Sequence, residues 1–375
     1  MNALVRSARV AVLAAAFLAL AAWLTGAAAA EGNAGAVYTI TNQVAGNAVA
    51  VFDRGADGAL TAAGQYPTGG LGSGGGLGNQ GALALSNGGR FLFVVNPGSD
   101  DVSSFRIKPG GGLELLDRIG SGGVRPISLT TSGDLLYVLN AGGAAGNISG
   151  FRVGSDGSLA AIAGSTRPLS AASVGPAQIQ FDPTGGTLVV TEKATQVIDT
   201  YAVGTNGIAS GPNVQASVGQ TPFGFAFDKR GHLIVSEAFG GTASALSSYV
   251  IGDGGGLSVI SPSVFAAQEQ AACWVVTTGN GKFAYTTNTA SGSISGYAIG
   301  HDGSLSLIDS DGLTAVTGGA PIDAALSRND QFLYTLNAST RRIDAFRVEA
   351  DGSLTALPGA GIGGLPAGVN GLVSA

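Results

Sequence analysis

The residues best suited to chemistry each end a short apolar segment that reads as a β-strand. Five of these segment ends are Asn and two are Glu. The seven residues are Asn42, Asn96, Asn140, Glu192, Glu237, Asn288 and Asn337. A buried carboxylate can act as a general base or bind a ligand, so Glu237 and Glu192 are candidate catalytic residues. Asn at a strand end commonly caps a turn. Capping is therefore favoured for the Asn residues, and the alternative is ligand binding by Asn96, Asn140, Asn288 and Asn337.

A second set of residues begins the apolar segment that comes before most of these strands. Its members are Gln80, Arg125, Gln178, Phe223, Trp274 and Asp323. Asp323 is a further acid candidate, and Arg125 or Lys193 could stabilise a developing oxyanion. The predicted ligand-binding residues of this region are Gln80, Gln178, Phe223, Trp274 and Lys193.

Histidine and cysteine contribute little to the candidate chemistry. His232 and His301 are the two histidines and Cys273 is the single cysteine, so the sequence predicts no Ser-His-Asp triad and no His-rich metal site. Glu and Asn oxygens do suit a hard cation, so Ca²⁺ bound in a central channel is an alternative use of the same residues. No other metal or cofactor is predicted.

A repeat accounts for how these residues are positioned. The strand pattern seen in Phe91–Asn96 occurs seven times, and a second, alternating strand such as 343–348 follows each copy after about ten residues. A turn pair such as Asp156-Gly157 or Asp351-Gly352 then leads into a third strand. Another apolar segment lies before each copy of the Phe91–Asn96 pattern and supplies the fourth strand of the repeat. Four strands at a spacing of about 45–50 residues are typical of propeller blades. The sequence therefore predicts an all-β, seven-bladed β-propeller, in which the C-terminal inner strand (369–373) pairs with the N-terminal strands to close the ring.

Residues 69–78 form a glycine-rich insert that departs from the repeat. A phosphate-binding loop would need a helix after it, and no helical pattern follows. We expect a flexible surface loop, with a lid over the channel as the alternative.

The composition limits the location and the partners. Charged residues make up 11% of the chain, the net charge is −6 and no basic stripe occurs, which argues against nucleic acid as a partner. Arg6 and Arg9, the short apolar run 10–24 and Ala28–Ala30 predict a signal peptide over residues 1–30, with a membrane anchor as the alternative. Residues 31–375 would then be one propeller domain, exported to the periplasm or secreted, monomeric and free of the membrane.

The strand Phe91–Asn96, the Asp-Gly-Ser-Leu turns at 156, 302 and 351, and the count of seven repeats resemble the lactonase-type propeller family with YVTN-type repeats. That family includes propeller-type 6-phosphogluconolactonases and carboxymuconate lactonising enzymes, so the resemblance implies hydrolysis or formation of a lactone. The family typically carries Pro-Arg-His or Pro-His at the start of inner strands, whereas this chain has Pro176-Ala177-Gln178 and Pro222-Phe223-Gly224. Glu237 matches the family's acidic position. The family's Arg and His are absent from both segments, and without these basic residues a phosphorylated sugar lactone is not the expected substrate.

Two functions follow as hypotheses. In the first, an exported lactonase-like enzyme uses Glu237 to activate water, Glu192 or Asp323 to assist, and Arg125 to polarise the carbonyl of a neutral or weakly polar lactone. In the second, the propeller is not catalytic and binds a ligand, polymer or partner protein through its funnel.

Overall fold

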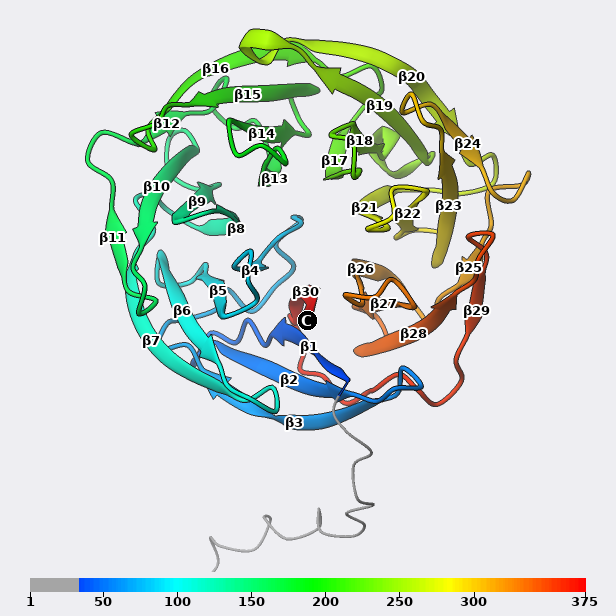
Figure 1. Cartoon of the computed structure of the whole chain (residues 1–375), viewed down its shortest axis with the longest axis horizontal. Helices are drawn as coiled ribbons and strands as arrows, with labels where there is room; N and C mark the ends of the chain where they lie inside the picture. Colours follow the sequence, from blue (N-terminus) through cyan, green and yellow to red (C-terminus); the bar gives the residue numbers. More distant parts are fainter. Residues whose placement is uncertain (1–33) are drawn as a thin grey trace, which may run out of the picture. The chain divides into compact units, whose positions relative to one another are not determined.

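The computed structural model describes residues 34–375, and the predicted signal peptide lies outside them. These residues form seven sheets arranged in a ring (Figure 1). Blade 1 consists of β1 (Gly35–Ile40), β2 (Ala48–Arg54), β3 (Leu60–Pro67) and β30 (Asn370–Ser374). Blade 2 consists of β4 (Leu83–Leu85), β5 (Phe91–Asn96), β6 (Asp101–Ile107) and β7 (Leu113–Gly120). Blade 3 consists of β8 (Pro126–Ser132), β9 (Leu135–Asn140), β10 (Asn147–Val153), β11 (Leu159–Ala161) and β12 (Arg167–Pro168).

The other four blades repeat this order. Blade 4 consists of β13 (Pro176–Phe181), β14 (Thr187–Glu192), β15 (Val197–Val203) and β16 (Ala209–Ala216). Blade 5 consists of β17 (Pro222–Phe227), β18 (Leu233–Glu237), β19 (Ala245–Ile251) and β20 (Leu257–Phe265), with the short 3₁₀ helices η1 (Phe239–Gly241) and η2 (Asp253–Gly255). Blade 6 consists of β21 (Ala272–Thr277), β22 (Phe283–Asn288), β23 (Ser293–Ile299), β24 (Leu305–Leu307) and β25 (Ala315–Val316). Blade 7 consists of β26 (Pro321–Leu326), β27 (Phe332–Asn337), β28 (Arg342–Val348) and β29 (Leu354–Ala356).

The predicted seven-bladed all-β fold is confirmed. In blade 1 the C-terminal strand β30 is innermost and runs antiparallel to β1, with Tyr38 opposite Val373. In blades 3 and 6 the outer strand is split, because β12 and β25 pair separately with the third strand of their blade. No helix within residues 34–375 is long and apolar enough to cross a membrane.

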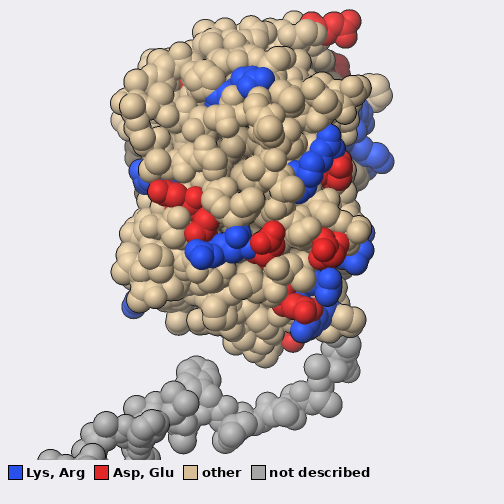
Figure 2. Space-filling view, turned by 90° about the vertical axis from the view of Figure 1, so that its left-hand side faces the viewer, with Lys and Arg blue, Asp and Glu red and all other residues tan. Residues whose placement is uncertain are grey.

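Burial explains the strand composition. The second strand of a blade is enclosed on both faces, and all six residues of β5 are buried. Outer strands such as β3 and β16 are largely exposed, with only their first residue buried. On the flank formed by the blades at the left of Figure 1, acidic and basic side chains lie near one another rather than forming a patch of one sign (Figure 2). Two ion pairs of these blades are Arg118–Asp101 at 2.8 Å and Arg152–Asp134 at 2.7 Å.

A turn glycine joins each of six blades to the blade before it. Its carbonyl oxygen accepts a hydrogen bond from a hydroxyl of the preceding blade, as in Tyr334 Oη to Gly58 O at 2.8 Å and Tyr285 Oη to Gly352 O at 2.8 Å. The remaining donor–acceptor pairs are Tyr137–Gly207 at 2.9 Å, Ser104–Gly157 at 2.7 Å, Thr200–Gly255 at 2.8 Å and Ser248–Gly303 at 2.7 Å. The hairpin between the third and fourth strands of one blade is thereby fixed to its neighbour.

Gly58 shows why this position is glycine. Its φ is +88°, a left-handed conformation that other residues adopt at a cost. A Cβ atom there would lie 2.5 Å from Cδ1 of Phe332, the first residue of β27. The turn can therefore pack closely against blade 7 only without a side chain.

We predict that Gly58→Ala destabilises the fold more than Gly110→Ala. Gly110 has the same φ of +88° but has open space where its Cβ would lie, so both variants carry a backbone cost of roughly 1–2 kcal/mol. Only Gly58→Ala adds overpacking against Phe332, worth about 1–3 kcal/mol. Denaturant unfolding of both variants measures the difference, and equal losses would contradict the role assigned to this joint.

Candidate functional site

The structure places the two predicted residue sets at the same end of the blades. The last residue of a second strand pairs with the first residue of the inner strand, as in Pro176 opposite Glu192 and Pro222 opposite Glu237. The same register puts Pro126 opposite Asn140, and Pro321 opposite Asn337. We call this end of the ring the top.

Four of the Asn side chains at the top donate hydrogen bonds to the third strand of their own blade, whereas Asn42 Nδ2 donates to Gly75 O of the insert at 2.7 Å. Asn96 Nδ2 donates to Asp101 Oδ1 at 2.6 Å and to Ser103 Oγ at 2.8 Å, so it ties β5 to β6. The other blades show the same arrangement, with Asn140 to Ser149 Oγ at 3.3 Å, Asn288 to Ser295 Oγ at 2.8 Å and Asn337 to Asp344 Oδ2 at 2.8 Å. These contacts are structural, but they tie the second strand to the third through side chains rather than capping a turn through its backbone groups.

Glu237 occupies the equivalent position in blade 5, and its carboxylate also points along the sheet. Oε1 accepts hydrogen bonds from Gly219 N at 2.9 Å and Ser247 Oγ at 2.5 Å, and Oε2 accepts one from Ser263 Oγ at 2.6 Å. The side chain is fully buried, which raises its pKa, and the three hydrogen bonds oppose that rise. The expectation that Glu237 faces the funnel is not met, because its partners belong to β19, β20 and the loop before β17.

Glu192 lies in a buried polar cluster of blade 4. Its Oε1 accepts from Ser170 N at 3.0 Å and its Oε2 from Thr195 Oγ1 at 2.7 Å, so it too faces away from the channel. Asp199 on β15 lies beside it and is fully buried. Burial, and then the neighbouring charge of Glu192, raise the pKa of Asp199 to about 8.

Asp199 was missed by the sequence reasoning, although a comparison of the repeats could have found it. The equivalent position of the third strand holds Ser in four blades: Ser103, Ser149, Ser247 and Ser295. In blade 7 it holds Asp344, whose charge is paired with Arg342 Nε at 2.8 Å. Asp199 has no such ion pair among the described residues, so blade 4 carries an uncompensated pair of acids.

The other two predicted catalytic residues lie apart from these. Asp323 on β26 is fully buried, accepts hydrogen bonds from Ala324 N at 2.8 Å and Leu372 N at 3.0 Å, and has a pKa raised well above its usual value by burial. Arg125 is exposed, and its backbone N donates to Asp100 Oδ1 at 2.6 Å. The structure therefore does not bring Glu237, Glu192, Asp323 and Arg125 together.

No calcium ligand set converges either. Within residues 34–375 no group of three or more His, Cys, Asp or Glu side chains could hold a metal ion. Asn140 Oδ1, Asn288 Oδ1 and Asn337 Oδ1 have no hydrogen-bond partner among the described residues, but each belongs to a different blade, and the oxygens of Glu192 and Glu237 are already engaged in hydrogen bonds.

The glycine-rich insert lies over the channel, and Figure 1 shows the segment between β3 and β4 reaching toward the centre of the ring. Residues 73–76 are exposed, as expected for a surface loop, but the following residues are anchored. Asn79 is buried, its carbonyl accepts from Trp274 Nε1 at 2.7 Å, and its side-chain amide donates to Ile127 O. The lid alternative therefore describes the segment better than a loop without contacts.

A top pocket of about 440 Å³ lies between this insert and the inner strands. Its walls are Gly74, Gly75, Gly76, Gly78, Trp274, Ile322, Ala338, Gly368, Val369 and Asn370. None of these side chains is charged, so the pocket suits an uncharged ligand with an apolar face. Of the predicted ligand-binding residues, Trp274 lines it directly.

Two further predicted residues extend this wall. The ring of Phe223 lies 5.0 Å from that of Trp274, and Lys193 Nζ lies 4.6 Å from the centre of the Phe223 ring. Lys193 Nζ also donates to the carbonyl of Gly78, a residue of the top pocket. Burial lowers the pKa of Lys193 to about 8, which makes it a weakly basic amine near neutral pH.

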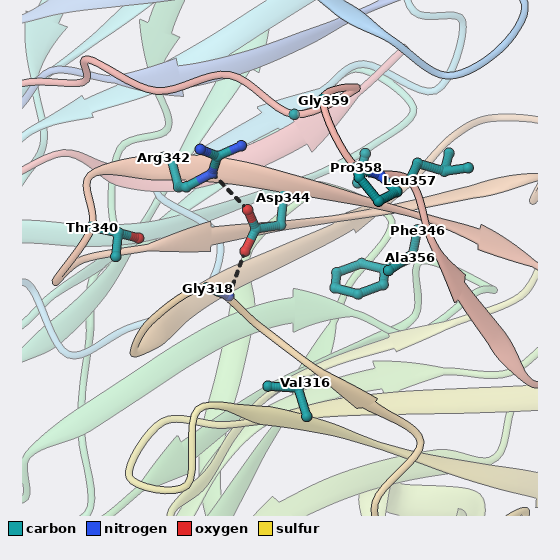
Figure 3. A pocket seen from close by; sticks show the side chains of 12 residues that line it. Val316, Gly318, Thr340, Arg342, Asp344, Phe346, Ala356, Leu357, Pro358 and Gly359 are labelled. Atoms are coloured by element: carbon teal, nitrogen blue, oxygen red, sulfur yellow. Dashed lines mark hydrogen bonds and ion pairs between the residues drawn. The ribbon is translucent and has the colours of Figure 1, made fainter.

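Two other cavities lie elsewhere. Gln80 and Gln178 line a lower cavity of about 400 Å³ along the inner strands. A rim pocket of about 530 Å³ lies between β25, β28 and β29 (Figure 3), where Asp344 bonds Arg342 Nε and the backbone N of Gly318. Asp344 joins blades 6 and 7 through these contacts, so its role in the rim pocket is structural.

Comparisons with known proteins agree with this architecture. Residues 36–167, which span β1 to β12, match the family described as "Lactonase, 7-bladed beta-propeller". The periplasmic gluconolactonase of Pseudomonas aeruginosa superposes with a TM-score of 0.70 at 18% identity, covering 90% of this chain and 99% of that one. A Bacteroides fragilis protein, provisionally assigned as a 6-phosphogluconolactonase, gives a TM-score of 0.70 at 20% identity, covering 92% and 98%.

At these identities the structural likeness establishes the fold. No curated protein gave a significant match. The family match over residues 36–167, together with the shared fold of the two structural neighbours, confirms the resemblance to the lactonase-type seven-bladed β-propeller family that the repeats predict.

Proposed function

We propose that the protein binds an uncharged lactone in the top pocket and hydrolyses it. The observation that carries the proposal is the uncharged pocket beside Trp274, at the end of the channel where the strand ends converge. The match of residues 36–167 to the lactonase family and the gluconolactonase among the structural neighbours support this chemistry. A phosphorylated lactone is not the proposed substrate, because the residues that line the pocket include no Arg or Lys and the one amine beside it, Lys193, is assigned to act as a neutral base.

Lys193 is the proposed general base. Its neutral amine takes a proton from water as the water oxygen bonds to the lactone carbonyl carbon. When the ring C–O bond breaks, the resulting ammonium returns the proton to the leaving oxygen, and a hydroxy acid is released. Lys193 would exchange its contact with Gly78 O for the attacking water.

Export to the periplasm or the outside is part of the proposal. It rests on the predicted signal peptide over residues 1–30 and is supported by the periplasmic location of the Pseudomonas aeruginosa neighbour.

Ligand binding without catalysis is the second candidate function. The observation that favours it is the engagement of Glu192, Glu237 and Asp323 in internal hydrogen bonds, which leaves the top pocket without a carboxylate of its own.

Gly76→Val should block the pocket without unfolding the protein. A Cβ atom on Gly76 would meet no atom within 4 Å, and the residue does not need a positive φ, so the added side chain projects into open space. We expect kcat/KM for neutral lactones to fall by roughly tenfold or more. Gly256→Val, with equally open surroundings in another loop, is the matched control. Equal turnover by both variants would remove the top pocket as the site.

Lys193→Met should abolish most of the activity and its pH dependence. With a pKa of about 8, Lys193 is mostly protonated at pH 6 and mostly neutral at pH 9. The kcat/KM of the parent should therefore rise with pH and level off above about 8, whereas the variant should lose about 10²–10⁴-fold. Lys229→Met, at an exposed site, is the control. A parent profile that falls between pH 6 and pH 9 would contradict a neutral lysine base.

Glu237→Gln should retain turnover within about twofold, since the amide can still accept from Gly219 N and the two serine hydroxyls can rotate. Glu237→Ala leaves two buried donors and the half-buried Ser263 hydroxyl without their acceptor and should lose roughly 2–4 kcal/mol of unfolding free energy. Thermal unfolding and lactone hydrolysis of both variants test this. A stable Gln variant without turnover would restore Glu237 as the base.

A further inference from the structure

The top pocket and the lower cavity follow one another along the same three inner strands. The top pocket is lined by Trp274, Ile322 and Asn370, whereas the lower cavity is lined by Val276, Asp323 and Leu372. On β21, Val275 alone separates the two lining residues. A side chain that is hydrogen-bonded to the backbone of Val275 therefore lies at the boundary between the top pocket and the lower cavity.

Gln80 occupies that boundary. Its side-chain Oε1 accepts from Val275 N at 3.0 Å and its Nε2 donates to Val275 O at 2.7 Å. Its backbone N donates to Ala177 O on β13 at 3.0 Å. One residue thus bridges the channel from blade 4 to blade 6.

The fit around Gln80 leaves little space. A Cβ atom on Gly224 of β17 would lie 2.1 Å from Gln80 Oε1, so the amide packs directly against the backbone of blade 5. Asn79 immediately before it is buried and bonded to blades 3 and 6. The bridge is therefore held from several sides.

We propose that Gln80 is a specificity-determining residue that closes the floor of the top pocket and limits the length of the ligand. The proposal rests on the proposed function, because it concerns the same pocket. The space below Gln80 has mixed walls, in which Leu83, Leu129 and Ile179 stand beside polar side chains such as Gln178 and Asp323. An aliphatic substituent would contact the apolar part of these walls, but the amide of Gln80 blocks its path. The substrates are accordingly lactones whose substituent ends above Gln80.

The test measures how ligand length affects binding and turnover. Trp23 and Trp274 are the two tryptophans of the chain, and Trp23 falls in the predicted signal peptide, so Trp23→Phe leaves Trp274 of the top pocket as the only tryptophan whether or not that peptide is removed. In this background, γ-alkyl lactones are assayed for hydrolysis, and 2-alkyltetrahydrofurans, which cannot be hydrolysed, are titrated against Trp274 fluorescence. Both series run from methyl to decyl.

The parent should show a length cut-off, beyond which affinity stops rising. Gln80→Ala should move the cut-off by several carbons, and each newly accommodated methylene should tighten binding by up to about fourfold, the value for complete burial. Gln80→Met keeps the volume without the hydrogen bonds and should keep the parental cut-off. Gln178→Ala is matched in stability, since Gln178 makes the same paired contact with Phe225 N at 2.7 Å and Phe225 O at 2.9 Å, and it should not move the cut-off.

The two proposals can fail separately. If the parent hydrolyses lactones but Gln80→Ala has the same cut-off, the role of Gln80 is overturned and the proposed function stands. If the ethers bind with a shifted cut-off while no lactone is hydrolysed, the proposed function fails and the role of Gln80 stands. If neither series binds to either protein, both are overturned.

Discussion

The contact between a turn glycine and the preceding blade is the constraint on which the structure depends. A hydroxyl of one blade donates to the glycine carbonyl of the next in six blades, and the close approach excludes a side chain at that glycine. The contact repeats at the same point of each hairpin, so it sets a similar relation between successive blades. Sheets stacked in this way form a ring and bring their inner strands to a common centre.

The top of that ring is polar because seven strand ends meet there, but most of this polarity is used internally. Asn96, Asn140 and Asn288 tie the second strand to the third. Glu237 does the same through Ser247, and the carboxylate of Glu192 accepts from Thr195 in the following turn and from Ser170 before blade 4. The space left for a ligand is consequently walled by glycine backbone and by Trp274 rather than by acids.

Residues that were predicted well from the sequence belong to local patterns. Phe91–Asn96 and the turn at Asp156-Gly157 recur at a fixed period, and the strands of each copy pair within one blade, so their positions determined the number of blades. Trp274 and Gln80 were assigned to the channel because each lies near the start of an inner strand, Trp274 inside β21 and Gln80 three residues before β4.

The direction of a side chain was harder to predict. A polar residue at a strand end can point into the channel or along the sheet, and its position in the sequence is the same in both cases. Glu237 points along the sheet because its partners Ser247 and Ser263 lie on the two following strands. The partner of Gln80 lies 195 residues away, so no local pattern could have revealed it. Lys193 gains its lowered pKa from burial beneath the insert and beside Phe223, which depends on the closed ring.

A crystal structure of the protein with a slowly hydrolysed, uncharged δ-lactone tests the central claim most directly. The account predicts electron density for the ring between Trp274 and the backbone of Gly75 and Gly76, with the lactone carbonyl toward Lys193. A lactone bound in the rim pocket at Asp344, or below Gln80 with the top pocket empty, would contradict it.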